Sequence, residues 1–351
     1  MKKVLSLAIA AALVAPAAAM ADATIFGKAH FIVENVDTTA STGATSVDAW
    51  GVDSIHSRIG VKGSEDLGNG LKALYHFEFK VNQDSGSGLG DRNQFIGLSG
   101  GFGTALLGTH DTPMKMSQGK FDQFGDLPNG DIANVMPGDD RVDNVIAYVS
   151  PAMGGFTFVG ALVAGERPDL ELDGLADHVS LAGLYSNGPI FASLAYNTYD
   201  LGTAVDADPT LLRGTFIWNG GMWQAGVMFN SLSLDLPGVD DPDSIGVSGN
   251  VKVGPGKIKL QYLMADSERA GISDVISGFT PNVAINNGVN FDLSTTPATA
   301  RATDNEVTQI SVGYEQALSK RTTWHAGYTM YEEDLTGKEV DALFAGLIHN
   351  F

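Results

Sequence analysis

The clearest pattern in the chain is a strict alternation of apolar and polar side chains with a period of two residues. It is longest between residues 71 and 81, where Leu71, Ala73, Tyr75, Phe77, Phe79 and Val81 alternate with Lys72, His76, Glu78 and Lys80. A helical period would place Lys72 and His76 on the same face as Phe79. The segment is therefore predicted to be a β-strand with one apolar face.

The same alternation recurs along the chain. One further segment alternates Ile55, Ile59 and Val61 with His56, Arg58 and Lys62, and another alternates Leu212, Phe216 and Trp218 with Arg213 and Thr215. The chain ends on the ladder Leu343, Ala345, Leu347, His349 and Phe351. In outer-membrane barrel strands one parity faces lipid, the other faces the lumen, and aromatic residues gather at the membrane edge. The pattern thus predicts transmembrane β-strands. Aromatic residues near segment ends suit a periplasmic girdle: Tyr148, Tyr185, Trp218, Trp223, Tyr314, Trp324 and Phe351.

Glycine-rich short turns and longer polar loops separate these segments in alternation. Seven short turns and eight long loops divide the chain into sixteen segments, which is the arrangement of a barrel with one short-looped and one long-looped end. No segment after the N-terminus has an apolar run long enough for a membrane-spanning helix. Since only helices and closed barrels satisfy their backbone in lipid, we predict an all-β fold, a sixteen-stranded antiparallel transmembrane barrel over residues 22–351.

The N-terminus predicts export. Lys2 and Lys3 precede an apolar run over residues 4–15 and the small-residue motif Ala19-Met20-Ala21. This is the pattern of a secretory signal peptide, here residues 1–21 with cleavage after Ala21.

The chain has 351 residues, no cysteine and a net charge of −20. Loss of residues 1–21 removes two lysines and no acid, so 19 basic and 41 acidic residues would remain, a net charge of −22. Such acidity argues against a nucleic-acid partner, because phosphate binding needs clustered Lys and Arg. The absence of cysteine is compatible with an exported protein that uses no disulfides.

Five stretches resemble the general, non-specific porins of Gram-negative outer membranes: residues 57–73, 92–99, 143–151, 314–322 and 347–351. The resemblance covers essentially the whole predicted mature chain. It implies a homotrimer in the outer membrane, surrounded by lipid and lipopolysaccharide. It also implies a water-filled channel for ions and small hydrophilic solutes, and no enzymatic activity.

The resemblance also implies where the channel narrows. In that family the third long loop folds into the barrel, and here it corresponds to residues 109–140, with the motif Phe124-Gly125-Asp126. The implied acidic side consists of Asp111, Asp122, Asp126 and Asp131, and the implied basic wall of Arg58, Arg92 and Arg141, with Lys62, Lys80 and Arg213 as further candidates. Fixed charges of opposite sign across a narrow aqueous gap bias which ions pass. Arginine suits such a wall because it stays charged at any relevant pH.

Two departures from the family affect the expected selectivity. Ala147 and Ile348 stand where the family often has a basic residue. Together with the charge of −22, they predict a mild cation preference. No cofactor is expected. Weak Ca²⁺ or Mg²⁺ binding is an alternative to a solvated acidic surface at two outer loops, which contain Glu166, Asp169, Glu171, Asp173 and Asp177, and Asp235, Asp240, Asp241 and Asp243.

Three other functions compete with a general channel. Residues 97–101 match the nucleophile motif G-x-S-x-G, but that motif needs a strand-to-helix turn, whereas a strand-to-strand turn is expected here. An adhesin or receptor could use the long loop near residues 268–304. A substrate-specific channel is the third alternative; sugar channels line their path with aromatic residues, and the sequence shows no run of lumen-facing aromatic residues that would require one.

Overall fold

The computed structural model describes residues 23–39, 46–82, 88–166, 168, 171–200, 208–233, 241–267, 305–334 and 337–351. The predicted signal peptide and the long loop near residues 268–304 lie outside these ranges. Within them, no helix has the length and apolar character needed to cross a membrane.

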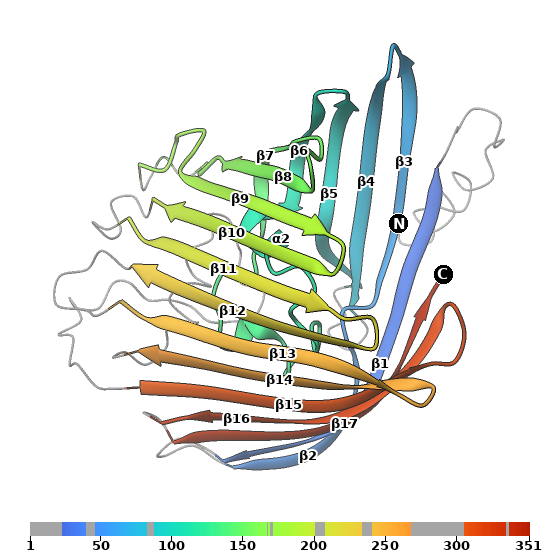
Figure 1. The fold of residues 1–351 in the computed structure, drawn as a ribbon, viewed down its shortest axis with the longest axis vertical. Coiled ribbons are helices and arrows are strands. Elements are labelled where there is room, and N and C mark those ends of the chain that lie inside the picture. The colour runs from blue at the N-terminus through green and yellow to red at the C-terminus, as the bar shows by residue number, and fades with distance from the viewer. Residues whose placement is uncertain are drawn as a thin grey trace.

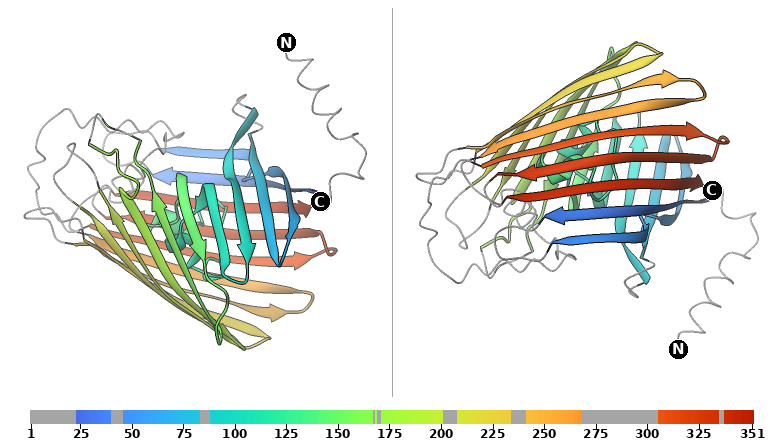
Figure 2. Two further views of the ribbon diagram at one scale, coloured as in Figure 1. Left: turned by 90° about the horizontal axis from the view of Figure 1, so that it is seen from above. Right: turned by 90° about the horizontal axis from the view of Figure 1, so that it is seen from below.

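Seventeen strands form the described part of one antiparallel sheet (Figure 1). They are β1 (Thr24–Thr39), β2 (Val47–Ser54), β3 (Arg58–Gly68), β4 (Leu71–Asn82), β5 (Gly88–Gly100), β6 (Gly103–Asp111), β7 (Arg141–Val149), β8 (Phe156–Val163), β9 (His178–Asn187), β10 (Ile190–Tyr199), β11 (Thr210–Asn219), β12 (Trp223–Ser233), β13 (Asp243–Val253), β14 (Gly256–Ser267), β15 (Asn305–Ala317), β16 (Thr322–Glu333) and β17 (Lys338–Asn350). From β3 onward each strand pairs with the next, and β17 pairs with β1, which closes the barrel (Figure 2).

Strands β2 and β3 together occupy one position in the barrel. β1 pairs with β2 along residues 31–38 and with β3 along residues 24–28, so the two short strands lie end to end opposite one long strand. Counted this way, the barrel has the sixteen strands that the turn pattern predicts. The interruption falls at residues 55–57, where His56 has a positive φ of 47°.

The interruption corrects one detail of the sequence interpretation. Alternation placed Ile55 on the apolar outer face with Ile59, yet Ile55 is only 4% exposed. It clusters inside the barrel with Phe124, Leu127 and Phe344. The physical reason is the break between β2 and β3, which shifts the parity of the side chains on either side of it.

The two ends of the barrel meet at the terminal phenylalanine. The Phe351 amide donates to the Gly27 carbonyl oxygen at 3.0 Å, and the Gly27 amide donates to the Phe351 carbonyl oxygen at 2.9 Å. A Cβ atom on Gly27 would lie 2.3 Å from the Phe351 ring, so only glycine leaves room for that ring. The predicted terminal ladder is confirmed as β17, whose residues 343 and 347 are exposed on the outer surface.

Burial along the strands is inverted relative to a water-soluble protein. Leu260 is 55% exposed and Phe229 is 44% exposed, whereas their polar strand neighbours Gln261 and Asn230 are 2% and 1% exposed. An apolar outer surface with polar side chains inside is the pattern of a barrel surrounded by lipid.

Residues 112–140 connect β6 to β7 and lie inside the barrel (Figure 1). We call this segment the inner loop. It contains helix α2 (Pro113–Met116) and the 3₁₀ turn η1 (Ile132–Asn134). Thr112 caps α2 by accepting from the Lys115 amide at 3.1 Å, and Pro113 occupies the first helical position, where a missing N–H costs nothing.

The G-x-S-x-G match falls on a hairpin. Ser99 belongs to β5, the next strand begins at Gly103, and the Ser99 hydroxyl lies 3.0 Å from that of Thr104 on β6. A nucleophile elbow needs a strand followed by a helix, so this arrangement does not form one.

Candidate functional site

Two aromatic side chains fix the inner loop against the barrel wall. Phe121 is fully buried beside Gly246, where an added Cβ atom would lie 2.7 Å from the ring. Phe124 is 2% exposed beside Gly313, where an added Cβ atom would lie 2.9 Å from the ring. Glycine at these two wall positions therefore gives the rings the space they occupy.

Wall side chains from β13 to β15 also bind the backbone of the inner loop. The Ser248 hydroxyl donates to the Phe121 carbonyl oxygen at 2.5 Å. The side-chain amides of Gln261 and Gln309 both donate to the Gly130 carbonyl oxygen at 3.0 Å. Because these inward side chains satisfy loop carbonyls that water does not reach, they hold the loop in one position.

Arg213 binds the inner loop near both of its ends, where the loop leaves and rejoins the barrel wall. Its guanidinium donates to the Met114 and Pro137 carbonyl oxygens of the loop and to the Asn230 side chain. The side chain is fully buried. The structure thus places Arg213 behind the loop, where its donors are used, and not on the open basic wall for which the family pattern made it a candidate.

Asp126 lies at the point where the inner loop meets the opposite wall. Its carboxylate accepts from the Lys28 ammonium group at 2.7 Å and lies 3.9 Å from the Arg58 guanidinium. Burial opposes the charge of Asp126, but Lys28 and Arg58 outweigh it and hold the pKa of this carboxyl well below its usual range. Asp126 therefore stays ionised.

A second carboxylate lies within the basic wall itself. Glu78 on β4 accepts a hydrogen bond from the Arg92 Nε atom and lies 3.9 Å from the Arg58 Nε atom. Both Glu78 and Arg92 are buried at 8% exposure. Glu78 thus offsets part of the charge of two predicted wall arginines.

Arg141 pairs with the strand beside it. Its guanidinium lies 2.8 Å from the Asp111 carboxylate and donates from Nε to the Asn93 side chain at 2.7 Å. Asp111 is the last residue of β6 and pairs in register with Arg141, the first residue of β7. Asp111 is therefore a wall residue at the root of the inner loop.

Asp122 and Asp131 bind the loop's own backbone. Asp122 accepts from the Phe124 amide at 2.8 Å and the Ile132 amide at 3.3 Å. Asp131 accepts from the Asp126 and Ala133 amides, both at 2.9 Å. Burial and the neighbouring acids raise the pKa of Asp122 to about 8 and that of Asp131 to about 6.

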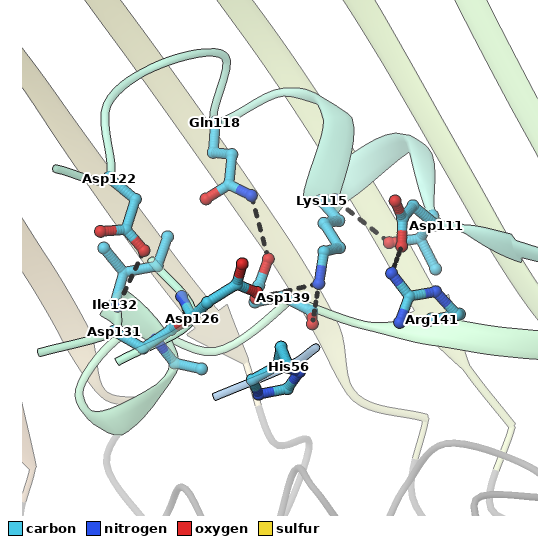
Figure 3. Close-up of polar contacts among 12 residues, drawn as sticks. His56, Asp111, Lys115, Gln118, Asp122, Asp126, Asp131, Ile132, Asp139 and Arg141 are labelled. Carbon is cyan, nitrogen blue, oxygen red and sulfur yellow. Dashed lines mark hydrogen bonds and ion pairs between the residues drawn. The ribbon is translucent and has the colours of Figure 1, made fainter. Parts of the chain in front are cut away.

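Further polar contacts join the two ends of the loop (Figure 3). The Lys115 ammonium group is 3.0 Å from the Asp139 carboxylate, which also accepts from the Gln118 amide at 3.1 Å. Figure 3 shows these residues on one side and the Arg141–Asp111 pair on the other. Burial, together with the charge of Asp139, raises the pKa of Asp140 to about 6.

The two wall lysines predicted from the sequence are placed differently from each other. The Lys62 ammonium group lies 5.0 Å from the centre of the Phe26 ring. Lys80 pairs in register with Arg58. Within the described residues, no acidic group lies within 4.0 Å of either ammonium group.

The structure brings three of the ten predicted site residues into one network and adds two partners. Arg58, Arg92 and Asp126 form one network, which also contains Lys28 and Glu78. Alternation did put Glu78 on the inner face, but it could not show which basic side chain Glu78 pairs with. Lys28 follows two apolar residues in a strand whose alternation is weak, and its role emerges only from strand register.

The predicted outer-loop acids show no metal-binding arrangement in the part of the chain that the structure describes. There, no three His, Asp or Glu side chains lie close enough to hold a metal ion. Asp169, Asp235 and Asp240 lie outside the described residues.

Known proteins are similar to this chain over nearly its full length. The model of the Gram-negative porin family matches residues 7–336. Outer membrane porin protein 32 of Delftia acidovorans is 27% identical, with 99% of this chain and 95% of that protein covered. Major outer membrane protein P.IB of Neisseria lactamica is 30% identical, with both chains covered completely.

A solved structure supports the fold. The structure described as the anion-selective porin from Comamonas acidovorans superposes with a TM-score of 0.72 at 22% identity, covering 94% of this chain and 99% of that one. With the closed barrel, the apolar outer surface and the family match over most of its length, the chain belongs to the Gram-negative porins and is an outer-membrane porin.

Proposed function

We propose that the barrel is a water-filled channel for passive diffusion of ions and small hydrophilic solutes. The observation that supports this most is the contact of the inner loop with the far wall, where Asp126 meets Lys28 and Arg58. This contact narrows the lumen and surrounds it with fixed charges of both signs. Such charges set which ions pass most readily.

We propose further that the channel prefers anions. Six basic groups lie along the wall (Lys28, Arg58, Lys62, Lys80, Arg92 and Arg141), against the three acids Glu78, Asp111 and Asp126. Asp122 and Asp131 add less negative charge at neutral pH, because their raised pKa values keep them partly protonated.

This proposal replaces the cation preference expected from the total charge of the chain. Charges in the outer loops act weakly at the constriction, because salt screens interactions over about 8–10 Å. The charged side chains named above along the wall are mostly basic, six against three. The similarity to a porin described as anion-selective is consistent with this local balance.

The protein is further proposed to act as a homotrimer in contact with outer-membrane lipid and lipopolysaccharide, as the resemblance to general porins implies. The outer surface has abundant exposed apolar side chains, as lipid or a second subunit requires.

The test is reconstitution of the purified mature protein in a planar bilayer under a KCl gradient. We expect large ohmic current steps that close in thirds at high voltage. The reversal potential should lie nearer the equilibrium potential of chloride than that of potassium. Absence of current from folded protein would contradict the channel, and a reversal potential on the potassium side would contradict the proposed anion preference.

A further inference from the structure

Four rings from four different strands form a continuous row on the inner wall. They are Phe26 on β1, His76 on β4, Phe95 on β5 and His110 on β6. Successive ring centres are 5.2, 5.2 and 5.1 Å apart, and the His76 and Phe95 planes are nearly parallel, at 4°. We call these four residues the ring row.

Strand register produces the row. His76 pairs directly with Phe95 on one side and with Lys62 on the other. β3 lies between β1 and β4, and at Gly60 it has no side chain: a Cβ atom there would lie 2.6 Å from the Phe26 ring. Phe26 therefore crosses β3 and reaches His76, which makes the row continuous.

The ring row faces the lumen and not the lipid. The strand neighbours of Phe26, His76 and Phe95 point outward, since Ile25, Phe77 and Ile96 are 49%, 46% and 59% exposed on the outer surface. The His110 ring packs against Phe95 on the opposite, inner side. The four rings are each partly exposed on the inner side. In a water-filled channel, part of an apolar surface is thus left open to passing solutes.

Positive charge borders the ring row at both sides. On β1, Lys28 is the next inward residue after Phe26, about 7 Å along the strand. Arg92 is three residues before Phe95 on β5, and Lys62 lies over the first ring. A solute with a flat apolar body and a negative group fits both features at once.

We propose that the ring row is a binding site for planar aromatic carboxylates. The aryl ring would lie against His76 and Phe95, in the offset arrangement that aromatic pairs prefer. The carboxylate would meet the ammonium group of Lys62, which pairs in register with His76 and lies over the Phe26 ring, in a charge-assisted contact. The site rests on the proposed channel function and gives that channel a preferred class of solute.

The chemistry separates this ligand class from two others. A neutral sugar could stack on the rings but would gain nothing from the adjacent cations. An aliphatic carboxylate would be attracted by the cations but would lose the ring contact. Only an aryl carboxylate uses both.

The test compares two acids of similar size and equal charge, benzoate and cyclohexanecarboxylate, added to the reconstituted channel at pH 8. Each is titrated against the chloride current, and the concentration that halves the current is measured. We expect benzoate to act at a concentration roughly two- to tenfold lower, the range of an aromatic pair contact. Equal potency of the two acids on the conducting wild-type channel would overturn the site.

Variants locate the effect. Phe95→Leu and, independently, His76→Leu keep an apolar side chain and should each reduce the difference between the acids by at least half. Phe77→Leu, on the lipid-facing side of the same strand as His76, is the matched control and should leave the difference unchanged. An undiminished difference in both ring-row variants would overturn the proposal. Loss of all current in the wild-type protein would instead overturn the channel itself.

Discussion

Glu78 offers a direct test of whether local charge sets selectivity. The substitution Glu78→Gln removes one negative charge from the basic wall and keeps an acceptor oxygen for the Arg92 Nε atom. It leaves Arg58, which lies 3.9 Å from the same carboxylate, without a negative neighbour on that side. The wall becomes more positive, so the channel should prefer chloride more strongly.

The magnitude follows from Coulomb's law. For an ion passing about 6.5 Å from the carboxylate in water, one unit charge contributes about 0.6 kcal/mol, reduced to about 0.3 kcal/mol by 0.1 M salt. Its removal favours anions and disfavours cations by the same amount. The chloride-to-potassium permeability ratio should therefore rise about three- to ninefold, with the larger value at low salt.

The assay is the reversal potential of single trimers under a tenfold KCl gradient. Glu339→Gln is the matched control, because it changes the net charge equally at an exposed position at the far end of β17. It should shift the reversal potential by little or nothing. Equal shifts in both variants would show that total charge governs selectivity and would refute the reasoning from local charge.

Three further predictions concern the inner loop. The pKa values of Asp131 and Asp122 are raised to about 6 and about 8, so both carboxyls favour the folded protein at low pH. This contribution to stability is lost as the pH rises from about 4 to about 8. Over the same range the two carboxyls ionise and the inner loop gains negative charge. Anion preference, measured by reversal potential, and the unfolding temperature should both fall over this range, and Asp122→Asn should flatten the upper part; profiles that are flat in the wild-type protein would contradict these pKa shifts. Arg213→Leu removes the donors to two loop carbonyls and should lower stability by about 3 kcal/mol or more, seen as a lower unfolding temperature and a noisier open-channel current; an unchanged trace would mean that the loop does not depend on this residue. Gly246→Val should displace the aromatic ring beside it at a cost of about 1–3 kcal/mol, whereas Gly101→Val, where no atom lies within 4 Å of an added Cβ atom, should be tolerated in the same thermal assay.

The barrel could be predicted from the sequence because each strand is constrained independently. A residue on a barrel strand faces either lipid or lumen, so alternation over residues 71–81 reports the strand directly, and β4 is found at Leu71–Asn82. The break before β3 was not predictable in this way. It depends on Ile55 turning inward to meet Phe124 of the inner loop, a contact between residues far apart in the chain.

The site was predictable in residue type but not in pairing. Arg58 stands on a lumen-facing position that alternation identifies, and Arg92 on one that the family resemblance implies. Their shared partner Glu78 becomes evident only from the register of β3, β4 and β5. The ring row could not be predicted from the sequence for the same reason. Its members stand one to a strand, so no single segment of sequence shows a run of aromatic residues.

The contacts of Phe121 and Phe124 with the wall glycines have a consequence for how porins of this kind can evolve. A hollow barrel has no hydrophobic core of its own, and here the inner loop provides one by packing against the wall. Shortening that loop to widen the passage would also strip the cover from the apolar wall residues around Gly246 and Gly313. The pore diameter and the stability of the protein therefore depend on the same loop. Exchange of charged residues at the open edge of the loop can change the passage without removing this cover.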